Sequence, residues 1–548
     1  MKDWLEKFAA ALARKDINAA ADLFEPGGFW RDLVAFTWNI RTSEGRDEIK
    51  AMLAATLLHT DPSHFVSRGD WFSFETKVGR GIGHARLREG RCWTLLTTLQ
   101  ELKGFEEKRE SPDDKAPLSE SPYVAIIGGG QGGIGLAARL KRLGVPAVIL
   151  EKNERAGDSW RKRYKSLCLH DPVWYDHMPY LPFPDHWPVF SPKDRIADWL
   201  EMYVKVMQLD YRAGTECFGC VFENGVWSIK TSKGDIRATH LVLATGMSGF
   251  PSIPDVPSTF SGEAVHSSAF KGEGDYAGKK AVVVGAGTSA HDIAAMLVKG
   301  GADVTMVQRA PSIVVTSEAL QELAWGPLYS EQALRNGITT PIADLTVAAT
   351  PFKLLPEFQK PIYEKIRARD AKLYEGLEKA GFLFNMGEDG SGIHSLYLRR
   401  GAGYYIEVGA SQMIIDGRIK LRSKVGVERL SDRSVVLSDG SEIPADVVVW
   451  ATGYGSMNQW AEKLISKEVA DKVGKVWGLG SGTKGDPGPW VGELRNMWKP
   501  TQVENLWFHG GNLMQSRHYS LYLALQLKAR MEKIPTPVFF IDPVHHLQ

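Results

Sequence analysis

Apolar residues at helical spacing open the chain and give way to strand-like segments before residue 105. They recur at intervals of three and four in two stretches, Trp4–Leu12 and Ile49–Leu57. Strand-like segments broken by glycine then occupy residues 65–102. Helices followed by an antiparallel set of strands predict a separate α+β domain over residues 1–105.

A polar stretch separates this front domain from the rest of the chain. Residues 106–120 begin with a charged, proline-containing run, which predicts a linker. The pattern then becomes strand, glycine turn, helix and strand. The first such unit has the apolar run Val124–Ile127, the turn Gly128–Gly133 and a strand at Ala147–Glu151. This order is typical of an α/β dinucleotide-binding domain.

The same unit occurs a second time between Ala281 and Arg309, with its turn at Gly285–Ala290. Two further apolar strands end in the same tripeptide, Ala-Thr-Gly, one at residues 244–246 and one at residues 451–453. Because one precedes and one follows the second unit, we predict nested Rossmann-like domains. Residues 121–262 and 438–548 would form the outer domain, and residues 263–437 the inserted one.

Each glycine turn is suited to a pyrophosphate. The first glycine permits a tight bend, the second lets the backbone approach the phosphates, and the third position stays small so that helix and strand pack closely. The phosphates then meet free N–H groups at the start of a helix. The candidate cofactor contacts are Gly128, Gly130 and Gly133 in the first turn and Gly285, Gly287 and Ser289 in the second.

The residue that ends the second strand differs between the two units. Glu151 can accept hydrogen bonds from ribose hydroxyls and would repel a 2′-phosphate, so the first turn is predicted to bind FAD or NAD. Arg309 can pair with a 2′-phosphate, which favours NADPH at the second turn. Two such sites in one chain suggest that a hydride passes from one cofactor to the other.

Composition narrows the function classes without naming one. The formal net charge is +1, and 43% of residues are hydrophobic, which predicts a cytoplasmic globular protein without a nucleic-acid or membrane partner. No metal site is expected, because Cys217-x-x-Cys220 has no second ligand pair. The pair leads into a strand and opens no helix, so we interpret it as a chance pair of reduced cysteines.

Two further motifs resemble the class B flavin-containing monooxygenases. The segment from Phe260 to Lys271 matches the family's identifying pattern at every specified position, with Phe270 where Baeyer–Villiger monooxygenases of the first type carry tryptophan. Ala451-Thr452-Gly453-Tyr454 matches the second family signature. The resemblance covers residues 121–535.

The resemblance implies a two-step flavin reaction. NADPH reduces FAD, and the reduced flavin adds dioxygen to form a C4a-(hydro)peroxyflavin, which transfers one oxygen atom to a small ketone or a soft sulfur or nitrogen nucleophile. It also implies that Trp160 packs beside the flavin. His170 stands where typical members have asparagine and the Baeyer–Villiger type has aspartate. We expect His170 to be catalytic, by hydrogen-bonding the flavin peroxide; a histidine that only fixes the loop is the alternative.

The front domain departs from most of that family. Its element order resembles the cone-shaped nuclear transport factor 2-like fold, and members with this architecture have been called type II, a group associated with Baeyer–Villiger oxidation of small ketones. The polar residues Arg31, Asp32, His64 and His84 form no convincing acid/base pair. We therefore expect structural support or a homodimer contact.

One further prediction concerns the carboxy-terminal region, and two questions stay open. Gly511 and Asn512 are predicted to precede a helix from about Tyr519 whose start faces the flavin. The aromatic residues between Trp174 and Trp187 either line a substrate cavity or pack the core. The rival functions are a pyridine-nucleotide disulfide reductase, which needs a dithiol beside the flavin, and a non-oxygenating flavoprotein whose front domain binds a partner.

Overall fold

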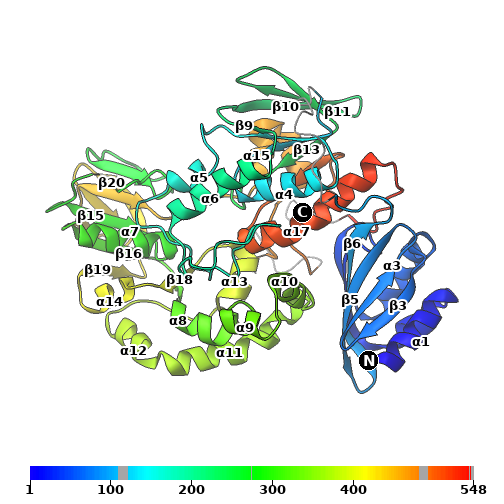
Figure 1. Cartoon of the computed structure of the whole chain (residues 1–548). Helices are drawn as coiled ribbons and strands as arrows, with labels where there is room; N and C mark the ends of the chain where they lie inside the picture. Colours follow the sequence, from blue (N-terminus) through cyan, green and yellow to red (C-terminus); the bar gives the residue numbers. More distant parts are fainter. Residues whose placement is uncertain (109–120, 273, 481–491, 542, 545–548) are drawn as a thin grey trace.

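The computed structural model describes residues 1–108, 121–272, 274–480, 492–541 and 543–544. Most of the predicted linker lies outside these residues. Figure 1 shows the front domain beside two larger units, each built on its own parallel sheet. The α/β class with two nucleotide-type domains, predicted from the repeated strand–turn–helix unit, is confirmed.

The front domain is a six-stranded sheet with three helices packed on one face (Figure 1). The strand order is β2-β1-β6-β5-β4-β3, antiparallel except for the parallel pair β1 and β6. The elements are α1 (Lys2–Ala13), α2 (Ile17–Asp22), β1 (Phe24–Leu33), β2 (Ile40–Glu44), α3 (Gly45–Thr60), β3 (Ser63–Arg68), β4 (Trp71–Glu75), β5 (Gly79–Arg88) and β6 (Arg91–Leu102).

Aromatic rings fill the space between this sheet and its helices. Trp30 stacks on Phe24 at 5.8 Å between ring centroids and meets Phe8 and Phe36 edge-on. The carboxylate of Asp32 is buried and accepts hydrogen bonds from the Thr37 and Thr97 hydroxyls. Asp32 thus anchors the local backbone, and the interior is a packed core.

The first nucleotide domain is built on the parallel sheet β24-β13-β7-β8-β9. Three antiparallel strands, β10, β11 and β12, form a separate small sheet. Its elements are β7 (Val124–Ile127), α4 (Gln131–Arg142), β8 (Ala147–Leu150), α5 (Asp158–Arg161), α6 (Lys193–Val206), β9 (Tyr211–Arg212), β10 (Cys217–Glu223), β11 (Val226–Thr231), β12 (Ile236–Ala238), β13 (His240–Leu243), α15 (Asn458–Leu464), α16 (Lys467–Val473), β24 (Leu506–Phe508) and α17 (Leu513–Met531).

The second nucleotide domain has the parallel sheet β14-β23-β15-β16-β19. Its elements are β14 (Glu263–His266), β15 (Lys280–Val284), α7 (Thr288–Lys299), β16 (Asp303–Gln308), β17 (Ile313–Thr316), β18 (Tyr404–Glu407), α14 (Ala410–Ile415), β19 (Ile419–Ser423), β20 (Val427–Ser431), β21 (Ser434–Leu437), β22 (Glu442–Pro444) and β23 (Val447–Trp450). A helical segment within it comprises α8 (Ser317–Leu320), the π-helix η1 (Gln321–Trp325), α9 (Glu331–Arg335), α10 (Thr340–Ala348), the 3₁₀ turn η2 (Phe352–Leu354), α11 (Leu355–Arg369), α12 (Ala371–Lys379) and α13 (Gly392–Arg400).

Strand β23 corrects the predicted domain boundary. We expected the chain to return to the outer domain at residue 438, which would place β23 in the first sheet. Instead, β23 pairs with β14 on one side and β15 on the other, so it belongs to the second sheet. A buried apolar strand does not by itself indicate which of two similar sheets it joins, and the crossing back lies beyond β23.

The two Ala-Thr-Gly segments have the same structural role, one behind each glycine turn. A Cβ atom on Gly128 would lie 2.3 Å from the carbonyl oxygen of Ala244, and one on Gly285 would lie 2.4 Å from that of Ala451. Both glycines also have positive φ, at 112° and 125°. The first glycine of each turn is therefore required by close approach to a neighbouring strand end as well as by backbone conformation.

Helix α17 begins earlier than predicted. We expected it to start near Tyr519, whereas it runs from Leu513, with the Asn512 side chain accepting a hydrogen bond from the Gln515 N–H. Its first turns carry the polar residues Gln515 and Arg517, yet both are buried. Because this helix is enclosed on all sides, it lacks the alternation of polar and apolar faces by which a surface helix is recognised.

The front domain is joined to the first nucleotide domain through a buried ion pair. Arg31 donates to both carboxylate oxygens of Glu493, at 2.7 and 2.8 Å, and both side chains are 1% exposed. Arg31 also donates to the Tyr519 hydroxyl on α17. At the other end of the interface, the Asn39 side chain donates to the Phe539 carbonyl. Within the described part of the chain, no helix is long and apolar enough to cross a membrane.

Candidate functional site

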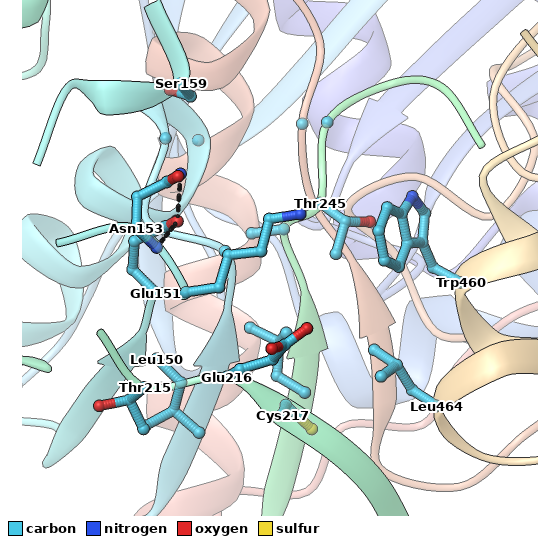
Figure 2. Close-up of a pocket in the computed structure, with 18 of the residues that line it drawn as sticks. Leu150, Glu151, Asn153, Ser159, Thr215, Glu216, Cys217, Thr245, Trp460 and Leu464 are labelled. Atoms are coloured by element: carbon cyan, nitrogen blue, oxygen red, sulfur yellow. Dashed lines mark hydrogen bonds between the residues drawn. The ribbon is translucent and has the colours of Figure 1, made fainter. Parts of the chain in front are cut away.

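The first glycine turn borders a cavity of about 270 Å³ at the carboxyl ends of β7 and β8. Figure 2 shows Glu151 and Asn153 on one side of this first pocket, with Trp460 and Leu464 of α15 on the other. The wall between them includes Thr215, Glu216, Cys217, Thr245 and the turn residues Gly128, Gly130 and Gln131. Ligand sites at this edge of a parallel sheet are a general feature of α/β folds.

The turn fits a pyrophosphate by the space around its glycines. A Cβ on Gly133 would lie 2.0 Å from the Gly128 carbonyl oxygen, so the third glycine is needed for helix–strand packing. A Cβ on Gly130, by contrast, would meet only the Ser159 hydroxyl at 3.9 Å. The predicted roles of Gly130 and Gly133 thus differ in the expected way: one borders open space and the other a packed contact.

Glu151 is buried and organises the first turn. One carboxylate oxygen accepts the Gly129 N–H at 2.7 Å, and the other accepts the Asn153 backbone and side-chain N–H groups at 2.8 and 2.7 Å. The oxygen that accepts the Gly129 N–H has a lone pair left, so the carboxylate can also accept a hydrogen bond from a ribose hydroxyl. Its negative charge disfavours a 2′-phosphate at this position.

A second cavity, of about 440 Å³, lies where the two nucleotide domains meet. From the first domain it is lined by Trp160 and Asn512, and from the second by Gly287 and Ser289 of the second glycine turn. The Trp160 indole N–H donates to the Gln131 side chain, and the Asn512 amide donates to the Tyr175 hydroxyl. The predicted contacts of both cofactors thus come together in one space. Gly511 borders the first pocket instead.

His170 lines this second cavity and faces a carboxylate of the second domain. Its Nε2 atom lies 3.8 Å from Oδ2 of Asp292 on α7, and the same oxygen accepts the Tyr164 hydroxyl at 2.6 Å. Burial lowers the pKa of His170, and the negative charge of Asp292 partly opposes this effect. Burial also raises the pKa of Asp292. Near neutral pH the histidine is therefore expected to be neutral, with its proton favoured on Nε2.

A second carboxyl group stands next to His170 on the cavity wall. Burial raises the pKa of Asp171 well above its ordinary value. Tyr175 and Trp325 border the same space. A carboxyl that can hold a proton near neutral pH, beside a neutral imidazole, is an arrangement suited to proton transfer.

The second turn repeats the geometry of the first. The two units differ in the residue that follows their second strand, which is Glu151 in the first and Arg309 in the second. A Cβ on Gly287 would meet only the Tyr404 carbonyl at 3.6 Å, so this glycine also borders open space. Arg309 directly follows β16, as predicted, and is exposed. It does not line the second cavity.

The fingerprint between the turns holds the domain crossing in place. His266, at the end of β14, is hydrogen-bonded through Nε2 to the Gly453 carbonyl and through Nδ1 to Ser268. A Cβ on Gly262 would lie 2.4 Å from the Asp446 carbonyl oxygen. His266 thus joins the two family signatures to each other, at Gly453.

The aromatic run from Trp174 to Trp187 mostly packs the first domain. Phe183 stacks on Trp187 at 4.9 Å, and both rings meet Trp199 of α6 edge-on. Tyr175 borders the second cavity, and the other aromatic residues of the run do not: Trp174, Tyr180, Phe183 and Trp187. Of the two interpretations left open, packing holds for this part of the run.

Several site residues were missed by sequence reasoning. Asp292 lies on α7 two residues beyond the second glycine turn, and Asp171 follows His170 directly. The available signal for Asp292 was a carboxylate directly before the apolar run of α7. Trp460 and Leu464 had none, because α15 approaches the first pocket only through the tertiary fold. The described residues contain no group of three or more metal-ligating side chains.

Comparison with known proteins agrees with this geometry. Residues 125–340 match the family model described as pyridine nucleotide-disulphide oxidoreductase. Indole-3-pyruvate monooxygenase YUCCA1 of Oryza sativa subsp. japonica is 30% identical over 363 residues, which cover 64% of this chain and 82% of that protein. Probable indole-3-pyruvate monooxygenase YUCCA4 of Arabidopsis thaliana is 28% identical over 340 residues, covering 61% and 76%.

A solved structure shares the fold at lower identity. The open crystal structure of cyclohexanone monooxygenase superposes with a TM-score of 0.52 at 16% identity, covering 76% of this chain and 88% of that one.

Proposed function

This chain belongs to the class B flavin monooxygenase family, and from that premise we propose that it transfers one oxygen atom from O₂ to a small ketone or to a soft sulfur or nitrogen centre. The protein is an enzyme that uses FAD, NADPH and O₂. When bound, the flavin accepts a hydride from NADPH and activates dioxygen. The protein's own residues bind, orient and shield these groups.

One observation carries the proposal. The second cavity is lined both by Trp160 and Asn512 from the first domain and by Gly287 and Ser289 from the second. A hydride donor held at one turn and an acceptor held at the other would meet there. The cavity volume of about 440 Å³ must hold these reacting ends as well as the substrate, which favours a small organic molecule.

The first pocket is assigned to FAD and the second turn to NADPH. Glu151 suits an unphosphorylated ribose, and the open space at Gly130 suits a pyrophosphate. Arg309 is exposed at the end of β16, where a guanidinium can pair with a 2′-phosphate. Asn512 caps α17, whose N-terminal dipole supports negative charge on a reduced ring system beside it.

His170 is assigned the proton-handling role. The charge of Asp292 favours the tautomer with hydrogen on Nε2, which leaves Nδ1 as a proton acceptor. Tyr164 fixes the carboxylate by donating to the same oxygen. In this arrangement Asp292 is a positioning residue, and His170 is the group that meets the reacting atoms.

The front domain is assigned a supporting role, in the manner of a nuclear transport factor 2-like module. Its interior is filled by aromatic rings, and Arg31 reaches out of the sheet to Glu493. A homodimer contact through its remaining surface is compatible with that role. The disulfide reductase alternative is disfavoured, because the Cys217–Cys220 dithiol lies at the first pocket and not in the second cavity, where the reacting ends of the two cofactors would meet.

Product analysis tests the substrate class. The purified, FAD-loaded enzyme is incubated with NADPH, air and, separately, a cyclic ketone, a thioether and a tertiary amine. We expect an ester or lactone from the ketone, or a sulfoxide or N-oxide from the other two. NADPH consumption with reduction of a small disulfide, and no oxygenated product from any of the three, would support the reductase instead.

A further inference from the structure

The two cysteines of β10 lie against each other at the wall of the first pocket. The Sγ atoms of Cys217 and Cys220 are 3.6 Å apart, and both thiols are free. Cys217 lines the pocket beside Glu216 (Figure 2), whereas Cys220 is 3% exposed and belongs to the core. A small solute entering the pocket therefore meets one thiol with its partner directly behind it.

A β-bulge brings these thiols together. In a regular strand, side chains three positions apart face opposite sides of the sheet. The register of β10 against β11 shifts between Cys217 and Gly219, which leaves Phe218 as the extra residue, 60% exposed. The bulge returns Cys217 and Cys220 to the same face. The pairing of the two thiols thus follows from a specific backbone feature.

The two thiols differ in reactivity. The hydrogen bond with Cys220 lowers the pKa of Cys217. The hydrogen bond to Cys217, together with burial, raises the pKa of Cys220. The thiolate is the reactive form of cysteine, so the pocket-facing Cys217 is the nucleophile and the buried Cys220 is placed to resolve it.

We propose that Cys217 and Cys220 form a dithiol site that hydrogen peroxide oxidises to a disulfide. The Cys217 thiolate attacks one oxygen of the peroxide, the O–O bond breaks, hydroxide leaves, and a sulfenic acid forms. The Cys220 thiol then attacks that sulfur, forming the S–S bond and releasing water. Together the two thiols lose two hydrogen atoms, and one peroxide becomes two waters.

The source of oxidant rests on the proposed function. A flavin monooxygenase that reduces O₂ without oxygenating a substrate releases hydrogen peroxide, so the protein is itself exposed to this oxidant. The sulfurs must approach from 3.6 Å to about 2.05 Å, a movement that draws Cys217 from the pocket wall towards the core. A ligand in the first pocket would cover Cys217, so occupancy should slow the oxidation.

Intact-mass measurement and thiol counting on the full-length protein test the site. After removal of reductant, treatment with hydrogen peroxide should remove the mass of two hydrogens and two of the four thiols, reversibly with dithiothreitol. Peptide mapping should link residue 217 to residue 220. Cys168→Ser removes an exposed cysteine elsewhere and should leave this product unchanged. Cys220→Ser should stop at a sulfenic acid on Cys217 that dimedone traps.

Two outcomes would overturn the proposal: retention of all four thiols under peroxide, or oxidation that consumes Cys168 and spares Cys217. Comparing flavin-loaded with flavin-stripped protein adds a second readout, and we expect severalfold slower disulfide formation in the loaded form. Equal rates would contradict the placement of the dithiol at the flavin pocket. Since mass is measured and not turnover, a protein that forms the disulfide but oxygenates nothing would refute the proposed function alone.

Discussion

His170 and Asp292 link the two nucleotide domains across the second cavity. The Nε2 atom of His170 lies 3.8 Å from Oδ2 of Asp292, and Tyr164 donates to that same oxygen at 2.6 Å. His170 and Tyr164 come from the segment after α5, whereas Asp292 comes from α7, the helix that begins at the second glycine turn. A displacement of α7 relative to the first domain would therefore change the environment of the histidine directly.

Replacing His170 should uncouple NADPH consumption from oxygenation. His170→Ala is expected to retain FAD and to oxidise NADPH at a near-normal rate, because the residue is assigned to the step after flavin reduction. Product formation should fall by about 100-fold or more, with hydrogen peroxide released instead. Parallel assays of NADPH, peroxide and product measure this. His170→Asn should keep part of the coupling; if His170→Ala stays fully coupled, the histidine only supports the loop.

Removing the charge of Asp292 should shift the pH dependence of coupling to lower pH. The carboxylate stabilises protonated His170, so Asp292→Asn lowers the histidine pKa further below its ordinary value. If neutral His170 is the active form, coupling is lost as pH falls through that pKa, and the loss should occur at lower pH in the variant. The ratio of product to NADPH across a pH series reports this. Asp303→Asn, which changes an exposed carboxylate of the same domain, is the control. If coupling in Asp292→Asn were lost at the same pH as in the parent, or at a higher pH, the assignment would be contradicted.

Equivalent substitutions in the two turns should each abolish the binding of a different cofactor. Gly130→Asp places a side chain and a negative charge in the open space of the first turn and should yield protein without flavin. Gly287→Asp makes the same change in the second turn and should keep the flavin spectrum while NADPH no longer bleaches it. Absorbance spectra before and after anaerobic NADPH addition distinguish the two. A yellow Gly130→Asp protein would remove the assignment of FAD to the first pocket.

Breaking the Arg31–Glu493 ion pair between the front domain and the first nucleotide domain should destabilise the whole protein. Glu493→Gln leaves the Arg31 guanidinium buried without its charge partner, which costs about 3–5 kcal/mol of unfolding free energy. Asp471→Asn breaks the exposed pair with Lys467 and should cost about 0–1 kcal/mol. Thermal and denaturant unfolding of both variants give the comparison. Equal unfolding free energies of the two variants would mean that the buried Arg31–Glu493 pair does not stabilise the protein more than an exposed pair does.

Local sequence patterns predicted the parts of the fold that local interactions determine. The two glycine turns, the strands before them and the acidic or basic residue after them follow from a fixed spacing, and the structure places Glu151 and Arg309 at those strand ends. The repeated Ala-Thr-Gly tripeptide is visible in the sequence, but the reason for its repetition is not. That reason is a contact between Gly128 and Ala244, and between Gly285 and Ala451, which only the folded chain brings together.

Contacts distant in sequence were not predictable from pattern. Arg31 and Glu493 are separated by most of the chain, and nothing in the neighbourhood of either residue indicates a buried pair. The β-bulge that places Cys217 and Cys220 on the same face depends on one extra residue in β10, which the strand pattern does not reveal. The start of α17 was missed because its polar residues are buried, where Gln515 accepts the Tyr397 hydroxyl and Arg517 pairs with Asp344, so no polar face marks the helix.

Oxygen-isotope labelling tests the central claim most directly. The FAD-loaded enzyme is supplied with NADPH, a ketone or thioether that it converts, and molecular oxygen enriched in oxygen-18, in unlabelled water. A monooxygenase places one labelled atom in the organic product and the other in water, so the product mass should rise by a single oxygen-18 atom for each turnover. Unlabelled product, or NADPH oxidation that yields only hydrogen peroxide with every substrate, would contradict the account.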